Sequence, residues 1–259
     1  MSASDRPAAE GIHSGHFPPS PVEAGHVAPS PRRVRGRVAD VWVFDSTRVS
    51  YVWEHPYYAQ YYVPAADVRA DLLVDDGERE TTDIGTFTLQ TIRVGDQQRP
   101  GGARLLAEPN DDALADTYRF EWSAIDQWFE EDEEIFVHPR SPYVRVDALR
   151  SSRPVRVVLD GTVLADAAGS VIVFETGLPP RYYLDKTAVD WSVLAPTDTV
   201  SECPYKGTTS GYWDARIGDR VVEDVAWGYD FPTRQLQPIT GLIAFFDDKV
   251  DIELGPASP

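Results

Sequence analysis

The chain has 259 residues, of which 42% are hydrophobic and 11% aromatic, so it can build packed cores and is not a wholly disordered protein. Its formal net charge of −18 argues against nucleic acid and anionic membranes as partners, because phosphate binding needs clustered lysine and arginine side chains. The single cysteine excludes an internal disulfide and a thiolate-rich zinc site. With no apolar run near the ~20 residues of a membrane span and no signal-peptide pattern, we expect a cytoplasmic protein without metal or cofactor.

Residues 1–31 are rich in proline and poor in large apolar side chains. Such a segment buries too little surface to offset its ordering entropy, so we predict a disordered leader, with order beginning near Arg32. Its histidines, His13, His16 and His26, are scattered, and we interpret them as incidental rather than metal-binding.

The rest of the chain consists of short apolar stretches bounded by turn residues, which is typical of an all-β protein. Two short segments, 65–73 and 187–194, place apolar residues about one helical turn apart and are each predicted to form one or two helical turns. The clearest predicted strands are 41–44, 50–54, 155–159, 171–175, 242–246 and 250–254.

An internal repeat decides the predicted architecture. With a shift of 121 positions, a strand ending in Glu and a Tyr-Tyr pair seven residues later occur in both halves. We therefore predict two tandem β domains, 32–150 and 151–259. The first carries an acidic insert at 95–116 with loop composition, and an acidic run at 130–134 that we interpret as a solvated turn. The matched pairs are Asp45 and Asp166, Val52 and Val173, Glu54 and Glu175, Tyr61-Tyr62 and Tyr182-Tyr183, Val68 and Val189, Leu73 and Leu194, Gly85 and Gly207, Arg93 and Arg216, Asp96 and Asp219, Trp122 and Trp227, and Val146-Asp147 and Val250-Asp251.

Three residues of the second copy are candidate catalytic groups. Cys203 is either a nucleophile, because a nearby lysine favours the thiolate, or a small buried hydrophobe. Lys206 precedes a glycine in a predicted tight turn and either clamps an anion or caps exposed carbonyls. Glu175 with Arg181 either orients a ligand and transfers protons, or forms a structural ion pair that fixes the loop.

Aromatic residues gather in the second copy in a number that exceeds the needs of a small core, because each hydroxyl and indole N–H requires a partner. A pocket with aromatic walls and polar tips satisfies this requirement, whereas core packing is the alternative for each residue singly. The candidate ligand-binding aromatics are Tyr182, Tyr183, Tyr205, Trp213, Trp227 and Tyr229.

The first copy has fewer candidates. Glu54 and Tyr62 occupy positions equivalent to Glu175 and Tyr183. His138 and Arg140 are a candidate acid–base and anion-binding pair, although a His-Pro-Arg segment is equally suited to a hairpin turn.

Several motifs resemble a known family: CPYKG, the YW pair that follows it, AWGY, and the closing IAFFDDKVDIEL. The chain is similar over residues 32–255 to domain-of-unknown-function family 427, sometimes labelled nucleotidyltransferase-like. YVWEHPYYAQYYVPAADV, EIFVHPRSPYVRVDALRSSR and FETGLPPRYYL further resemble the tandem form common in actinobacteria. The resemblance implies β-tent-like domains. Zinc-binding β-tent relatives use paired CxxC motifs, which this sequence lacks, and it has no glycine-rich phosphate loop or paired-Asp motif to support the nucleotidyltransferase label.

Three functions remain open from the sequence. The first is binding of a small organic or anionic molecule in the aromatic pocket, with or without acid–base catalysis. The second is a non-enzymatic interaction module that docks a protein partner, unidentified from the sequence, on the acidic first copy. The third is thiol chemistry at Cys203.

Overall fold

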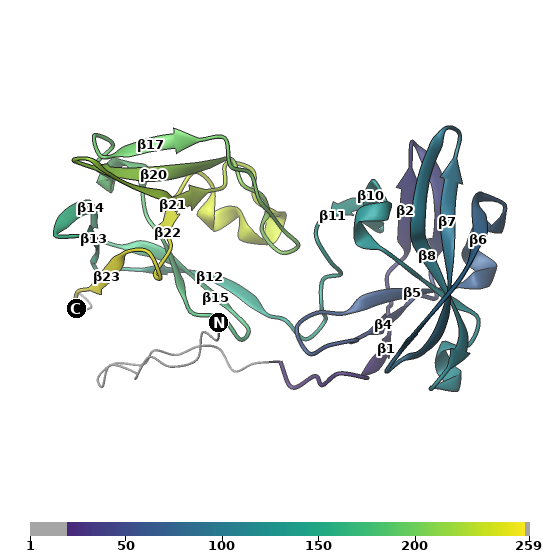
Figure 1. Cartoon of the computed structure of the whole chain (residues 1–259). Coiled ribbons are helices and arrows are strands. Elements are labelled where there is room, and N and C mark those ends of the chain that lie inside the picture. The colour runs from purple at the N-terminus through teal and green to yellow at the C-terminus, as the bar shows by residue number, and fades with distance from the viewer. Residues whose placement is uncertain (1–19, 257–259) are drawn as a thin grey trace. The chain divides into compact units, whose positions relative to one another are not determined.

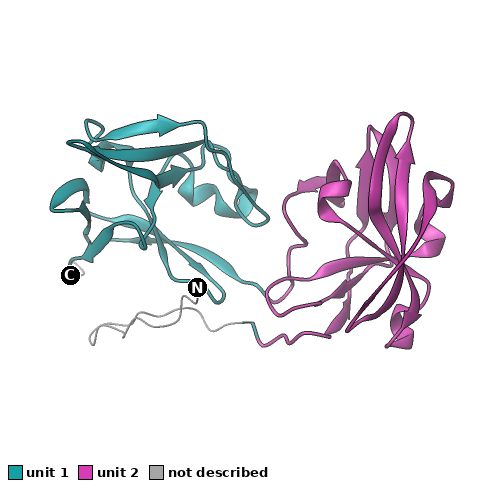
Figure 2. Ribbon diagram, viewed as in Figure 1, with its two compact units in different colours: residues 1–20, 144–259 teal, residues 21–143 magenta. Residues whose placement is uncertain are grey.

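The computed structural model describes residues 20–256, which belong to two compact units (Figure 2). One unit is Pro21–Tyr143, which we call the first copy; the other contains Val144–Pro259, which we call the second copy. Both units consist of β-strands with short 3-10 turns between them (Figure 1), so the predicted all-β class is confirmed.

The first copy contains a seven-stranded sheet and a four-stranded sheet. In strand β2 buried and half-buried residues alternate, as the two-residue period of a strand with one face on a core requires. The seven-stranded sheet has the order β1 (Val27–Pro29), β4 (Ser50–Val52), β5 (Gln60–Pro64), β9 (Thr117–Phe120), β8 (Gln97–Pro109), β7 (Gly85–Val94) and β6 (Leu73–Thr82). The four-stranded sheet has the order β11 (Glu133–Ile135), β10 (Gln127–Glu130), β2 (Val34–Val38) and β3 (Val41–Ser46).

The second copy repeats this strand order. An isolated bridge between Leu184 and Ile243 links its two groups of strands at the place where β5 pairs with β9 in the first copy. The larger series is β12 (Val146–Ser151), β15 (Ser170–Glu175) and β16 (Arg181–Tyr183), then β22 (Ile243–Phe245), β21 (Arg220–Gly228), β20 (Gly211–Ile217) and β17 (Leu194–Thr197). The remaining strands are β14 (Thr162–Ala167), β13 (Val155–Leu159) and β23 (Asp251–Leu254), and the hairpin β18 (Glu202–Cys203) with β19 (Gly207–Thr208).

The pairing register confirms the duplication. Val27 lies opposite Val52 and Ala148 opposite Val173, so both members of the second pair come 121 positions after the first. The isolated bridges Phe44–Val68 and Ala165–Val189 keep the same shift. The predicted helical turns also coincide, because η1 (Ala65–Asp67) and η5 (Lys186–Ala188) occupy equivalent positions, with η2 (Ala70–Leu72) following η1.

Two matches near the ends of the copies are wrong. Val146 begins β12, the first strand of the second copy, and is equivalent to the β1 region rather than to Val250. Trp122 lies in η4 (Trp122–Ala124), whereas Trp227 lies in β21 opposite Tyr212. These identities are chance ones, because Trp128 lies opposite Gly36 and Ile252 opposite Val157, so the shift late in each copy is 124 rather than the 105 that separates Trp122 from Trp227. We also assigned β12 to the first domain, but it pairs with β15 in the second copy.

Two loop predictions in the first copy also need correction. Order begins before Arg32, because Val27–Pro29 pairs with Ser50–Val52 as strand β1. The rest of the predicted leader, 1–19, lies outside the described residues. The acidic insert is not a loop throughout, because Gln97–Pro109 forms strand β8, which pairs on both sides with β7 and β9. These backbone partners override the low strand propensity of its glycines and proline.

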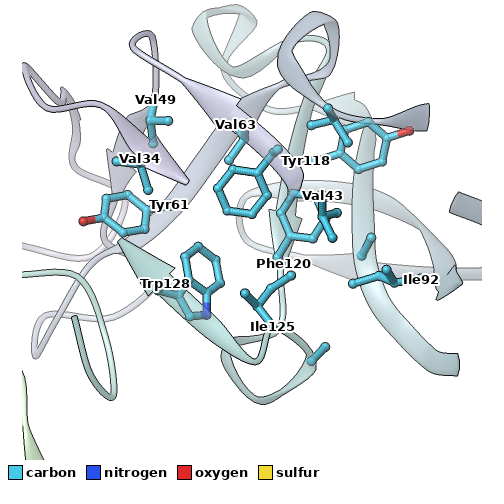
Figure 3. Packing of buried hydrophobic residues seen from close by; sticks show 14 of the residues in the cluster. Val34, Val43, Val49, Tyr61, Val63, Ile92, Tyr118, Phe120, Ile125 and Trp128 are labelled. Atoms are coloured by element: carbon cyan, nitrogen blue, oxygen red, sulfur yellow. The ribbon is translucent and has the colours of Figure 1, made fainter. Parts of the chain in front are cut away.

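Each copy has a larger and a smaller apolar cluster. In the larger cluster of the first copy, Tyr61, Phe120 and Trp128 gather with valines from β2, β3 and β5 (Figure 3). The rings of Phe44 and Phe120 stack with centroids 4.8 Å apart. The smaller cluster of the first copy contains Val52, Tyr62, Ile84, Phe87, Leu106 and Leu114.

The larger clusters of the two copies fill one equivalent position differently. In the first copy Gly36 lies opposite Phe44, and a Cβ at Gly36 would collide with the Phe44 ring. In the second copy the equivalent pair is Val157 opposite Ala165. In each copy the larger residue of the pair faces the smaller one. The larger residue is on β3 in the first copy and on β13 in the second, so the two pairs fill a similar space in different ways.

We expect Gly36→Val alone to destabilise the first copy by about 1–3 kcal/mol through overpacking. Phe44→Ala alone should cost about 3–5 kcal/mol through the cavity it leaves. The double variant, which copies the Val157–Ala165 pair, should cost less than the sum of the single changes, measured by urea unfolding of the full chain. Additive costs would show that the two positions do not share one volume.

Candidate functional site

The CPYKG motif forms a tight hairpin in the second copy. Cys203 at the end of β18 pairs with Gly207 at the start of β19, and Gly207 has a φ of 94°, which favours glycine. Thr233 fixes the turn, because its N–H donates to the Lys206 carbonyl at 3.0 Å and its hydroxyl to the Tyr205 carbonyl at 2.5 Å. Lys206 is buried in this turn.

Lys206 forms an ion pair with Glu175, the residue that ends β15. Its Nζ also lies 3.8 Å from the Sγ of Cys203, a half-buried free thiol. The side chains of Lys206 and Glu175 are 10% and 12% exposed, so solvent still reaches them. Burial lowers the pKa of Lys206, but Cys203, Glu175 and Tyr183 together raise it above its ordinary value, which keeps the ammonium charged.

Two buried tyrosines complete this cluster. The Tyr183 hydroxyl makes no hydrogen bond of normal geometry within residues 20–256, although the Trp227 indole interacts with it. Burial raises the pKa of Tyr183 to about 12, partly offset by Lys206. Burial also raises the pKa of Tyr229, with Tyr183, Cys203 and Glu175 adding to the effect. These interactions define the Lys206 cluster, which comprises Glu175, Tyr183, Cys203, Lys206 and Tyr229.

The first copy keeps the glutamate and one tyrosine of this cluster but has apolar residues at two other positions. By strand register, Ile84 stands for Lys206, Leu106 for Tyr229 and Thr82 for Cys203. Ile84 and Leu106 belong to its smaller apolar cluster. The equivalent fold therefore forms without a buried lysine or thiol at these positions.

The retained carboxylate of the first copy has different partners. Glu54 accepts a hydrogen bond from the Tyr62 hydroxyl at 3.0 Å and from the Nε of Arg119 at 3.1 Å. Arg119 lies in β9, where the second copy has Ala244, and it also pairs with Glu121. The predicted candidates Glu54 and Tyr62 thus contact each other and carry no unpaired donor.

The predicted aromatic set divides between the two clusters of the second copy. Trp227, Tyr183 and Tyr229 belong to the smaller cluster, where the Trp227 ring lies 4.1 Å from that of Phe246. Tyr182 and Trp213 pack against the larger cluster. The two groups of aromatic residues are separated because alternate residues of a strand face opposite sides of its sheet. The single pocket that would contain both Trp213 and Trp227 is therefore a wrong prediction. Tyr205, in the CPYKG turn, is buried.

Arg181 pairs with Asp247, and its guanidinium lies 6.0 Å from the Trp227 ring centroid. The predicted pairing of Arg181 with Glu175 is wrong, because Glu175 takes Lys206 instead. Spacing along the chain suggested the nearer arginine, whereas the hairpin brings in a lysine 31 residues away.

The predicted pair His138 and Arg140 have different partners among the contacts described. Arg140 binds Glu130, whose side chain is 1% exposed and also contacts Arg32 at 2.7 Å and the Tyr61 hydroxyl at 2.5 Å. The ring of His138 stacks on Tyr58 with centroids 4.5 Å apart. Glu130 begins the acidic run that we interpreted as solvated. The signal for its burial is its place in the alternation of β10, where Trp128 and Glu130 both face inward.

Within residues 20–256 no group of three or more His, Cys, Asp or Glu side chains is arranged to hold a metal ion. In the same part of the chain no helix has the length and apolar character needed to cross a membrane.

A family model described as Domain of unknown function (DUF427) matches the chain twice, over residues 26–131 and 147–255. The first match extends from β1 to β10, and the second from β12 to β23, so each match covers one copy. This confirms the family resemblance and the tandem organisation. No curated protein matches the chain.

We expect Lys206→Met to destabilise the second copy by about 3 kcal/mol, because it leaves the Glu175 carboxylate buried without its partner. The double variant Lys206→Met/Glu175→Gln should cost less than either single change, measured as a double-mutant cycle in urea. Lys186→Met is the control, because Lys186 and Asp230 form an exposed pair 3.2 Å apart whose loss should cost at most about 1 kcal/mol. Equal costs for Lys206→Met and Lys186→Met would contradict a buried charge pair.

Tyr183→Phe should leave stability at neutral pH unchanged or raise it by about 1 kcal/mol, because the removed hydroxyl makes no hydrogen bond of normal geometry within residues 20–256. Tyr62→Phe should lower stability, because it removes the bond to Glu54. The pKa of Tyr183 is about 12 in the folded protein against an ordinary 10.0. Its neutral hydroxyl therefore contributes fully to the free energy of unfolding below pH 10, and this contribution is lost as the pH rises towards 12. Unfolding at several alkaline pH values should show a smaller loss for Tyr183→Phe than for wild type. An equal loss of stability in Tyr183→Phe and wild type would show that the Tyr183 side chain is exposed to solvent.

Proposed function

The chain belongs to the DUF427 family of domains of unknown function, and from its site we propose that the second copy binds a small organic molecule and exchanges protons with it through Lys206 and Glu175. The supporting observation is the buried Lys206 cluster. Taking a lysine and a glutamate out of water costs several kcal/mol per ion before their attraction is counted. The first copy has Ile84 at the lysine position and pairs its glutamate with Arg119 instead. The fold common to both copies therefore does not require a lysine in this turn.

Unused hydrogen-bond donors indicate what the site recognises. An ammonium has three N–H donors, and in the described contacts Lys206 directs two of them to Glu175 and Cys203. The Tyr183 hydroxyl is a second donor without a partner of normal geometry. Two donors close to one another suit a carbonyl or carboxylate oxygen. Trp227 and Tyr229 supply an apolar environment, which strengthens these interactions.

The charges assign roles for proton transfer. The raised pKa of Lys206 keeps it an ammonium, which stabilises negative charge that develops on a bound oxygen. Glu175, a carboxylate paired with that ammonium, is the acceptor for a proton from the ligand. Cys203 adjoins both groups, and a thiol reaction at Cys203 is the competing chemistry.

The alternative of a protein partner docking on the acidic run has less support. Glu130 is neutralised inside the first copy, Glu131 accepts from the Arg33 N–H at 2.9 Å, and Asp132 pairs with Arg35 at 2.7 Å. These carboxylates are engaged within the copy, which lowers the charge left for a basic partner.

Benzoate and pyruvate are suitable probes, because each combines a carboxylate with an apolar or carbonyl group. We expect at least one of them to raise the melting temperature of the full chain and to change tryptophan fluorescence. Lys206→Met/Glu175→Gln should weaken binding about tenfold or more, as loss of a hydrogen bond to a charged group predicts. Glu54→Gln, the equivalent change in the first copy, is the matched control and should leave binding unchanged.

Unaltered binding in the double variant, or equal losses in Glu54→Gln, would contradict the proposal. Cys203→Ser separates the competing chemistry. If the variant still binds the probe and still exchanges protons with it, thiol catalysis is excluded. If it binds the probe but no longer exchanges protons, Cys203 takes the catalytic role that we assign to Lys206 and Glu175.

A further inference from the structure

The second copy also contains a groove of about 580 Å³, within the size range of small-molecule sites. It lies at the end of the β12–β15 pair, where Ser151 is opposite Ser170. Its polar lining includes Arg150, Ser151, Ser152 and Ser170, and its apolar lining includes Val171 and Leu242.

Two polar groups of this groove lack partners. The Oγ of Ser170 is buried and has no hydrogen bond among the described residues. The guanidinium of Arg150 forms no ion pair or hydrogen bond in the part of the chain that the structure describes, although acidic residues outnumber basic ones by 42 to 24. The Ser151 Oγ accepts from the Arg153 N–H at 3.3 Å, which leaves its own O–H able to donate. The groove is thus lined by an arginine whose guanidinium has no described partner and by three serines.

The first copy has large residues where the groove is open. By register, Arg48 and Val49 stand for Gly169 and Ser170. Val49 is buried, and Arg48 pairs with Asp67 at 2.6 Å. A Cβ at Gly169 would approach the Ser151 carbonyl oxygen to 2.6 Å, so this wall of the groove is bare backbone. The opening and its unpartnered serine are therefore specific to the second copy.

We propose that this groove binds a small organic anion, a carboxylate or a phosphate ester. Its charged group is held by the Arg150 guanidinium at the end of the β12–β15 pair, where the serines also line the groove, and its apolar part lies against Val171 and Leu242. Asp185 also lines the groove, and its Oδ1 accepts from the Thr187 N–H at 2.8 Å and the Thr187 hydroxyl at 2.7 Å. Its negative charge disfavours a second anionic group and selects a ligand charged at one end only.

This site stands independently of the Lys206 cluster. The two share Tyr183, which lines the groove and interacts through its charge with Lys206 in the cluster. The proposed anion-binding groups of the groove do not include the Tyr183 hydroxyl, Lys206 or Glu175. Variants of the groove therefore test it without disturbing the proton-transfer groups.

Inorganic phosphate and acetate, titrated into the full chain at constant ionic strength, provide the test by amide NMR. We expect saturable shifts at Ser151, Ser152 and Ser170. Arg150→Gln should weaken binding about tenfold, as loss of a charge-assisted hydrogen bond predicts. Ser170→Val, which copies Val49, should also weaken it. Arg153→Gln removes the same charge beside the groove and should have no effect, and Lys206→Met/Glu175→Gln should bind both anions normally.

Shifts that sodium chloride reproduces at equal ionic strength would overturn the proposal. So would equal binding by wild type and Arg150→Gln, or equal losses in Arg150→Gln and Arg153→Gln. The same spectra report whether each variant is folded, so loss of binding is distinguished from loss of structure.

Discussion

The antiparallel register between the strand that ends in glutamate and the strand that carries the Tyr-Tyr pair is the constraint on which both copies depend. Ser50 lies opposite Tyr62 in the first copy, and Val171 lies opposite Tyr183 in the second. Successive side chains of a strand point to opposite faces, so one tyrosine of each pair enters the larger apolar cluster and the other the smaller. A slip of one residue would exchange the two faces and direct the wrong tyrosine toward the glutamate.

Around this common frame the smaller cluster has diverged in polarity. The first copy closes it with Ile84 and Leu106 and gives its glutamate an arginine from a neighbouring strand. The second copy keeps the glutamate but supplies a lysine from a hairpin turn, and it leaves a tyrosine hydroxyl unpaired. Buried polar groups of this kind reduce stability unless fully satisfied, and their persistence is typical of sites that have a ligand.

The second copy also exposes more polar groups than the first at the end of the β12–β15 pair. Its strand β21 is shorter than β8, and the arginine and valine at the end of the equivalent strand pair become glycine and serine. Loss of these side chains exposes backbone and hydroxyl groups that the first copy covers. The duplication thus lets one copy serve as a reference for the other, because a feature present in only one of two equivalent folds is not required for folding.

The sequence by itself determined the all-β class, the duplication and the turn at CPYKG, because strand alternation, turn chemistry and repeated residues are all readable within short windows. It also indicated Glu175, Lys206 and Cys203, each separately, as candidate catalytic residues. Only the tertiary structure decided the partners. It paired Glu175 with Lys206 rather than Arg181, and Arg140 with the buried Glu130.

The tertiary structure also separated Trp213 from Trp227 and assigned β12 to the second copy. The reason is the same in each case. Which side chains meet depends on the register between strands far apart in the chain, and bulges and added residues change that register without a mark in the local pattern.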